Sequence, residues 1–303
     1  MSFSARSVSL FSALLLGVIS LPSAETPLEY RVTQVSGETG FIPKDGKEIS
    51  PLSAGISLEP GDRLVTGKNG RVEFATRAGT VMELKENSSL TVETISDQVS
   101  KFFLKVGRLF GKFASAATTG HSYSIESPVT VAAVRGTELG MCVEETGETQ
   151  AGVTEGTVVF SPVSDSEESI SPVAVGGVPV EMPGWKEGDV TVEESKGIVV
   201  KPHERPEHLN EIPPLVVKDL TWFPAARERV PKLREQWKDR QPMARLQLRQ
   251  QVLRERVKWK PPQHIRDGLH SPKQRMKDRF VPPAPHQPHR RNPPPRRGSP
   301  RDR

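Results

Sequence analysis

The sequence predicts an all-β fold, a compact sandwich or roll of short strands, followed by one or two basic helices and a disordered Pro/Arg-rich tail. Five times between 57 and 160 a glycine precedes a short run of β-forming residues. Apolar and polar residues alternate in these runs, which places one side of each strand in a core and the other in water. The five segments are 70–74, 79–84, 107–110, 136–143 and 156–160.

The alternating positions also predict which side chains form the core. Because side chains two apart lie on the same face of a strand, the apolar members of each run are expected to point into one shared interior. Glycine opens each strand by adopting backbone angles that other residues avoid. The predicted core residues are Val72, Phe74, Val81, Leu109, Leu139, Met141 and Val158.

Turn residues separate these strands. Asn69-Gly70 lies between two alternating segments and predicts a β-hairpin, because the favoured hairpin turn needs positive φ at both central residues. Glu86-Asn87-Ser88 predicts a second turn, and Ser127-Pro128 predicts a sheet edge or the start of a strand.

The first 24 residues are typical of a secretory signal peptide. Arg6 lies in a short polar start, Leu10–Leu21 is apolar, and small residues follow at Ser23 and Ala24. The apolar stretch is shorter than the roughly 20 residues that span a bilayer. We therefore expect removal of 1–24 and a periplasmic or secreted protein with no transmembrane segment after cleavage; the alternative is a retained amino-terminal anchor.

Charge divides the remaining chain into two parts. Residues 25–217 contain 17 Lys and Arg against 29 Asp and Glu, whereas 218–303 contain 24 against 8. Proline is frequent at the change of composition and again at the carboxyl end, where few apolar residues are available for a core. The predicted organisation is a β domain at 25–200, a Pro-rich linker at 201–224, a basic amphipathic helical segment at 225–260 and a disordered basic tail at 261–303.

The helical segment has one apolar face. Ala226, Val230, Leu233 and Trp237 step by helical spacing, and Pro242 breaks the helix or opens the next one. Two interpretations remain open: a solvated helix with one side resting on the β domain, or a basic arm that binds an acidic surface. The residues that would contact a partner or a polyanion are Arg245, Arg249, Arg254, Arg256, Arg290, Arg291, Arg296 and Arg297.

The sequence offers few residues for catalysis. Cys142 is the only cysteine, which excludes an internal disulfide, and its strand parity turns it away from Leu139 and Met141. His121 is the only histidine of the β domain and is expected in a solvent-exposed loop. We find no nucleophile and base at a recognisable spacing, no metal-ligand pattern and no phosphate-binding loop, so neither an enzyme nor a cofactor is expected.

The glycine-rich segments together resemble the FecR domain, named for a ferric-citrate signalling regulator. The similar pieces are Gly61-Asp62 with Thr66-Gly67, 72–74, 79–81, 107–109, 124–128, 134–139 and 155–158. The resemblance implies an envelope-located β module that mediates protein contacts and, in its best-known members, relays a signal to a sigma factor. We carry over the β module alone, without the anti-sigma and membrane-spanning parts, since the signal peptide begins at Met1.

These observations favour a non-enzymatic, exported protein-interaction module of the bacterial cell envelope, with a signalling or scaffold role. The expected partner is an envelope protein. The alternative is a polyanion-binding protein that acts through its basic carboxyl-terminal tail, on an anionic cell-wall polymer or lipid surface. Export makes nucleic acid a less favoured partner.

Overall fold

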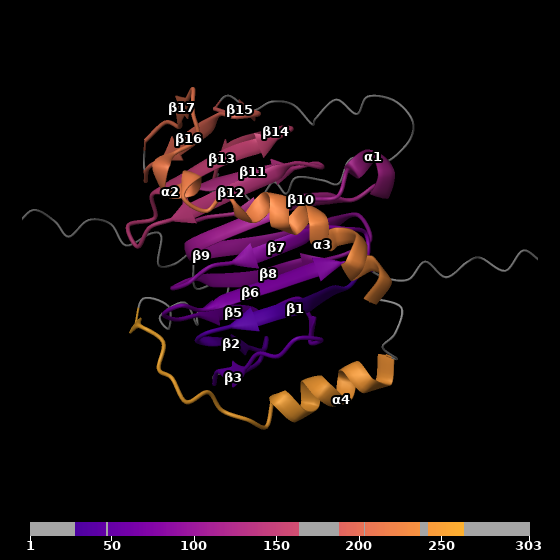
Figure 1. Cartoon of the computed structure of the whole chain (residues 1–303). Helices are drawn as coiled ribbons and strands as arrows, with labels where there is room; N and C mark the ends of the chain where they lie inside the picture. Colours follow the sequence, from indigo (N-terminus) through magenta and orange to yellow (C-terminus); the bar gives the residue numbers. More distant parts are fainter. Residues whose placement is uncertain (1–27, 47, 164–187, 203, 237–241, 264–303) are drawn as a thin grey trace, which may run out of the picture.

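The computed structural model describes residues 28–46, 48–163, 188–202, 204–236 and 242–263. The predicted signal peptide at 1–24 and nearly all of the predicted tail at 261–303 lie outside these residues. Within the described chain the protein is mostly β-strand, with four short to medium helices, as the alternating sequence pattern predicts (Figure 1).

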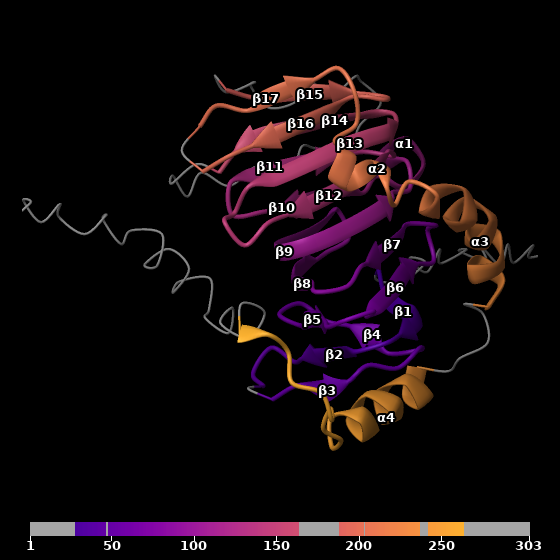
Figure 2. The same ribbon diagram turned by 60° about the vertical axis from the view of Figure 1, so that its left-hand side comes forward.

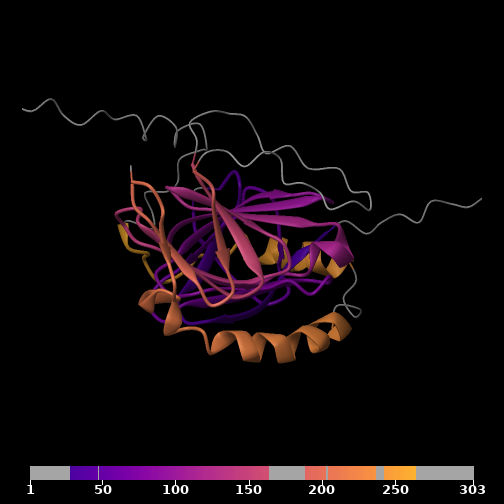
Figure 3. The same cartoon turned by 90° about the horizontal axis from the view of Figure 1, so that it is seen from above.

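The strands form a hydrogen-bonded sheet that folds over itself into two layers (Figures 1 and 3). One layer, here called sheet A, contains in spatial order β4 (Ser57–Leu58), β1 (Tyr30–Ser36), β6 (Arg71–Thr76), β7 (Val81–Leu84), the second half of β9 (Val99–Lys112), β12 (Glu138–Val143), β13 (Thr149–Glu155), β16 (Gly197–Val200) and β17 (Glu207–Leu209).

The other layer, sheet B, is built in the same way around the first half of β9. Its order is β3 (Ser50–Pro51), β2 (Thr39–Ile42), β5 (Arg63–Thr66), β8 (Ser89–Ile95), β9, β10 (Ser122–Glu126), β11 (Thr130–Val134), β14 (Thr157–Pro162) and β15 (Val190–Glu193). The β9–β10 pair is parallel and the other pairs of the described strands are antiparallel.

The long strand β9 joins the two layers at Gly107. Residues before it pair with β8 and β10, and residues after it pair with β7 and β12. Gly107 has φ of 99°, and a Cβ there would lie 2.0 Å from Ser88 Oγ. Only glycine fits this backbone and this close approach, so it sets the point where the strand changes sheets. It lies inside a strand and does not open one.

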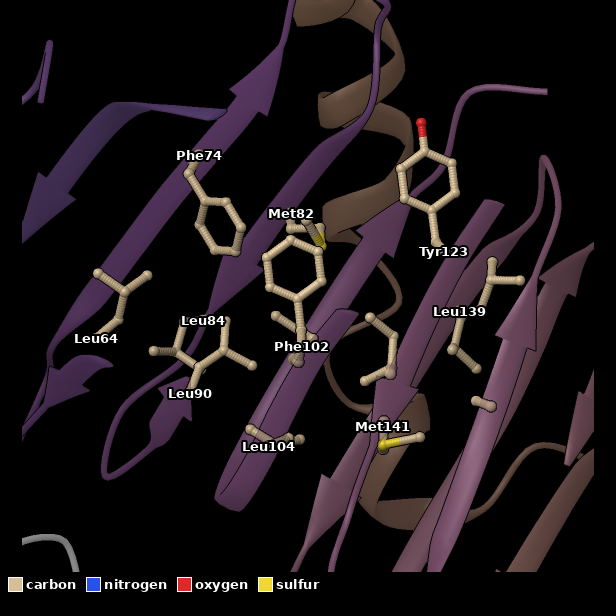
Figure 4. Packing of buried hydrophobic residues seen from close by; sticks show 14 of the residues in the cluster. Leu64, Phe74, Met82, Leu84, Leu90, Phe102, Leu104, Tyr123, Leu139 and Met141 are labelled. Carbon is tan, nitrogen blue, oxygen red and sulfur yellow. The ribbon is translucent and has the colours of Figure 1, made fainter. Parts of the chain in front are cut away.

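The core lies between the two sheets and confirms six of the seven predicted core residues. Phe74, Met82, Phe102, Leu139 and their neighbours pack together with little or no exposure (Figure 4). Val81 is the exception. It pairs with Ala75 and points to the outer face of sheet A, where it belongs to a second apolar cluster. Consecutive residues of a strand point to opposite faces of the sheet, so Val81 points outward where its neighbour Met82 points into the core.

The predicted hairpin at Asn69-Gly70 is wrong. A turn does form there, since the Gly70 N–H donates to the Gly67 carbonyl at 3.0 Å and Asn69 has φ of 55°. The flanking strands β5 and β6 belong to different sheets, however, so the turn carries the chain from one layer to the other. The residues at 69–70 form the local turn that their types favour, but strand pairing is decided by the rest of the sheet.

The segment 201–224, predicted as a linker, contains a strand and a short helix that pack on the β domain. Strand β17 extends sheet A, and helix α2 (Pro214–Val217) rests on β12 and β13. Three in-register glycines, Gly140, Gly152 and Gly197, make room for it: a Cβ at each would lie within 2.4–2.6 Å of Val216, Ile212 or Pro213. A row without side chains lets the chain pack directly on the strand backbone.

The remaining helices complete the fold. Helix α1 (Ala116–Thr119) connects β9 to β10, α3 (Trp222–Gln236) crosses the outer face of sheet A, and α4 (Pro242–Val252) closes one end of the sandwich (Figures 1 and 2). Pro242 begins α4, one of the two outcomes that the sequence allows for it. No helix of the described chain is long and apolar enough to cross a membrane.

Candidate interaction surface

The segment after β17 wraps around the sandwich, and we call the described residues 214–263 the arm. Trp222, Phe223 and Ala226 are buried against Phe110 on the outer face of sheet A. Helix α4 then covers the end of the core with Val252, which is 3% exposed. Further on, Trp259 covers the outer face of sheet B and donates its indole N–H to the Thr39 carbonyl at 3.4 Å.

The described helical segment therefore rests on the β domain, which is the first of its two sequence interpretations. Ala226 is buried and Val230 is partly buried in the apolar cluster beneath α3, as their spacing predicts. The side chain of Leu233 and all of Trp237 lie outside the described part. Apolar packing of one helix face supplies most of the stability of such a short helix.

Arg249 of α4 is held by a fully buried carboxylate. Its two terminal nitrogens donate to Asp62 Oδ2 at 2.7 Å and Oδ1 at 2.8 Å, and one of them also donates to the Ser57 carbonyl at 3.0 Å. Glu59 lies 3.2 Å away and the guanidinium lies over the ring of Phe41, with 5.3 Å to the ring centroid. This two-pronged geometry is the strongest form of an arginine–carboxylate pair.

A second buried carboxylate, Glu138, receives an arginine from α3. Arg227 donates to Glu138 Oε1 and Oε2, each at 2.6 Å, and Lys112 donates to Oε1 at 3.1 Å. Burial alone would raise the pKa of the Glu138 carboxyl, but these hydrogen bonds and charges outweigh it and hold the pKa below its usual value. Arg227 also reaches Glu155 at 3.2 Å.

A third carboxylate, Glu73, lies on the outer face of sheet A directly opposite Glu83. Like charges at paired positions repel, so each needs a cation: Arg229 of α3 reaches Glu73 at 2.5 Å, and Lys85 pairs with Glu83. The Thr33 hydroxyl donates to Glu73 at 2.9 Å. Burial nevertheless dominates and raises the pKa of the Glu73 carboxyl.

A cavity of about 480 Å³ lies between sheet A and the arm at this point. Strands β1, β6 and β7 form one wall, and the connection from α2 to α3 forms the other. The lining is mainly charged and polar: Gln34, Ser36, Arg71, Glu73, Glu83, Lys85, Lys218, Asp219, Thr221, Trp222 and Arg229. Asp219, on the arm side of the cavity, also pairs with Arg108 of β9.

The arginines selected from the sequence have different environments. Arg249 is 8% exposed and committed to Asp62, so it is not presented to an external polyanion. Arg256 pairs with Glu48, and Arg254 is exposed. The side chain of Arg245 lies outside the described side chains, and Arg290, Arg291, Arg296 and Arg297 lie outside the described residues.

The sequence prediction missed the residues that join the two halves. These residues are acidic members of alternating strand segments or of the turns beside them, and the alternation predicts that an acidic side chain there faces solvent: Asp62, Glu73 and Glu138. Arg227 and Arg229 were available as the cations of an acid-binding arm, but nothing in the sequence assigned a carboxylate to either of them.

His121 is buried, which corrects its prediction as an exposed loop residue. It is 3% exposed; its Nδ1 lies 3.1 Å from the Asp97 carbonyl and its Nε2 lies 2.9 Å from the Ser100 hydroxyl. A carbonyl only accepts, so Nδ1 carries the proton and Nε2 accepts from Ser100. Burial lowers the pKa of the imidazole. Both ring nitrogens are thus engaged, and the Ser100 side chain is buried.

Cys142 faces away from Leu139 and Met141, as its parity predicts, and is 8% exposed. Burial raises the pKa of its thiol to about 11, so the thiolate is scarce at neutral pH. Among the described residues no three His, Cys, Asp or Glu side chains are grouped to hold a metal ion.

The geometry defines a two-layer β sandwich clasped by a basic arm. Residues 62–159 match the family model described as FecR protein. This match confirms the resemblance to the FecR domain seen in the sequence. The match begins just before β5 and ends in β14, so β1–β4 and the whole arm lie beyond it.

Two solved structures are similar to this chain, both of a protein from Parabacteroides distasonis ATCC 8503 provisionally described as an anti-sigma factor. The first is 15% identical with a TM-score of 0.38, over 53% of this chain and 64% of the other. The second is 19% identical with a TM-score of 0.30, over 52% and 58%. The chain thus spans less than two thirds of the length of either. No curated protein matches it.

Proposed function

We propose that this chain is an exported, non-enzymatic protein-interaction module of the bacterial cell envelope with a regulatory, signalling-related role. The FecR match at 62–159 carries the proposal. Export is supported by the composition of residues 1–24, where a short apolar stretch follows Arg6. The envelope protein that it binds is the partner class that the FecR resemblance implies.

The described polar groups support binding in preference to catalysis. The one close serine–histidine pair, Ser100 and His121, is buried, and neither residue lines the cavity at the arm. The Cys142 thiol has a raised pKa. The charged clusters at Asp62, Glu73 and Glu138 are matched with arginines, which is the pattern of a structural contact between two parts of a chain.

The polyanion alternative is less favoured for the described arm. Of the three predicted contact arginines whose side chains are described, Arg249 and Arg256 already pair with carboxylates of the β domain, whereas Arg254 is exposed. A polyanion would have to displace these two pairs to bind at Arg249 or Arg256.

The test is co-purification from envelope extract with the full chain as bait, followed by binding of the purified partner. We expect a single envelope protein to bind the purified chain, and the mature chain to lack about 24 residues by mass. Binding that is lost when a heparin-like polymer is added, with no protein partner that binds after purification, would favour the polyanion alternative. An intact Met1 on a membrane-bound chain would contradict export.

A further inference from the structure

We propose that the cavity between sheet A and the arm binds a small organic anion, whose carboxylate or phosphate oxygens are held by Arg71 and Lys218. Arg71 begins β6 and lies on the sheet wall of the cavity, whereas Lys218 directly follows α2 and lies on the arm wall. The inference goes beyond the proposed function, which assigns a protein partner and no small ligand.

The cavity has the size and the lining of a site for a polar small molecule. Its volume of about 480 Å³ lies within the roughly 300–1,000 Å³ that small-molecule sites occupy. Gln34, Ser36 and Thr221 supply amide and hydroxyl groups beside the charged side chains. An apolar ligand would leave these polar groups without partners, so a ligand that forms hydrogen bonds is favoured.

Every acidic side chain of the cavity lining already has a basic partner in the chain itself. The pairs are Glu73 with Arg229, Glu83 with Lys85, and Asp219 with Arg108. A cationic ligand would have to displace one of these partners before it could reach a carboxylate. The carboxylates of the lining therefore do not favour a cation as the occupant.

Two basic side chains of the lining are available to a ligand. Within the described residues, neither Arg71 nor Lys218 forms an ion pair, and both are exposed. They belong to opposite walls of the cavity, so an anion that contacts both of them joins sheet A to the arm. Binding of such an anion would stabilise the arm in the position in which it lies on the sheet.

The cavity walls also contain hydrogen-bond donors that lack acceptors. The indole N–H of Trp222, a residue that is 6% exposed, and the Nε of Arg229 have no hydrogen-bond partner among the described residues. Both residues line the cavity. A buried donor without an acceptor costs free energy, so a ligand with several acceptor oxygens matches this lining.

Helix α3 adds to the preference for negative charge. The helix begins at Trp222, and no acidic residue lies in its first turn. Thr221 and Trp222 place this end of the helix at the cavity. The amino-terminal end of a helix carries a partial positive charge, which attracts an anion.

Thermal unfolding of the full chain with added ligand tests the proposal. The probes are succinate, inorganic phosphate and the uncharged diamide succinamide, each at about 10 mM and at the same ionic strength, because salt screens charge. At least one of the two anions should raise the melting temperature, since a ligand that binds only the folded state stabilises it, and succinamide should not. The anion with the larger effect identifies the ligand as a carboxylate or a phosphate.

The variant Arg71→Ala/Lys218→Ala removes both proposed contacts. It should need at least about 10-fold more anion than the wild type for the same shift of the melting temperature, because hydrogen bonds to charged groups are lost. Both side chains are exposed, so the variant is expected to fold, and circular dichroism checks this. The single variants should each lose part of the response, which keeps the test valid if the double variant does not fold.

The matched control is Arg77→Ala/Lys232→Ala. Arg77 directly follows β6 and Lys232 lies on α3; both are exposed, and neither lines the cavity. This variant loses the same charge and should respond to the anions as the wild type does. Equal responses of the two double variants would show a general salt effect and overturn the site. So would a wild type that responds to neither anion, or that responds equally to succinate and succinamide.

Discussion

Arg249 and Asp62 form a buried, two-pronged ion pair although they are 187 residues apart in the sequence. Asp62 is the first residue of the FecR match, and Arg249 lies on the arm beyond it. The arm thus supplies the counter-charge for a carboxylate that the domain itself buries. A segment that its composition marks as a basic appendage is part of the folded domain at this position.

Arg249→Ala should destabilise the chain strongly. It leaves the Asp62 carboxylate buried and unpaired, which costs about 3–5 kcal/mol when one partner of a buried pair is removed. Chemical denaturation followed by circular dichroism gives the free energy of unfolding. Arg254→Ala is the matched control on the same arm and should stay within about 0.5 kcal/mol of the wild type. Similar small effects of both substitutions would show that the pair contributes nothing to stability.

Glu138 and Glu73 should give opposite pH dependences of stability. The folded-state pKa of Glu138 is lowered, so its stabilisation is present above the unfolded value of 4.5 and is lost as the pH falls through the folded pKa. The folded-state pKa of Glu73 is raised, so its contribution improves as the pH falls through that raised value.

Denaturation curves of Glu138→Gln and Glu73→Gln at a series of acidic pH values check this. As the pH falls, the wild type should lose stability relative to Glu138→Gln and gain stability relative to Glu73→Gln. The same sign for both variants would mean that the arginine partners do not distinguish the two carboxyl groups.

His121 should make the fold sensitive to pH near neutrality. Burial lowers its folded-state pKa below 6.5, so the neutral ring is favoured in the folded protein and its contribution is lost as the pH falls below about 6.5. Melting temperatures of the wild type and His121→Gln, measured between pH 8 and 5, should converge or cross as the wild type weakens. If the two melting temperatures differ by the same amount at every pH in that range, protonation of His121 does not cause the loss of stability.

Gly152→Ala should push α2 and its preceding residues off sheet A. A Cβ at this position would lie 2.5 Å from Ile212 Cγ2, and overpacking of this kind costs about 1–3 kcal/mol. The double variant with Ile212→Ala has room for the new methyl group, so its destabilisation should be less than the sum of the two single changes. Additive effects in this double-mutant cycle would mean that the two residues do not touch.

Much of the fold could be predicted from local sequence. Alternation assigns Phe74, Leu109 and Met141 to the core because strand parity is a property of neighbouring residues, and the helix face of Ala226 and Val230 follows from spacing in the same way. The glycines before β7, β12 and β14 have positive φ, which is also a local requirement.

What the local pattern could not decide is which elements meet. Asn69 makes the expected turn, yet the turn crosses between sheets, because pairing depends on strands far away in the chain. Val81 has a core-like sequence context but faces α3, and His121 is buried by the packing of β9 and β10 around it.

The sequence by itself determined the strand pattern, the acidic and basic halves and the FecR resemblance, since each depends on residue type and short spacing. Only the tertiary structure decided that the basic arm clasps the acidic domain through Asp62 with Arg249 and Glu138 with Arg227. From the sequence, the two halves are known only to carry opposite charge, and attraction between exposed charges is weakened by salt screening. Asp62 and Arg249 are buried, so salt does not screen this pair, and its strength depends on how the guanidinium of Arg249 meets the carboxylate. Whether a side chain is buried depends on the whole fold and not on the neighbouring sequence.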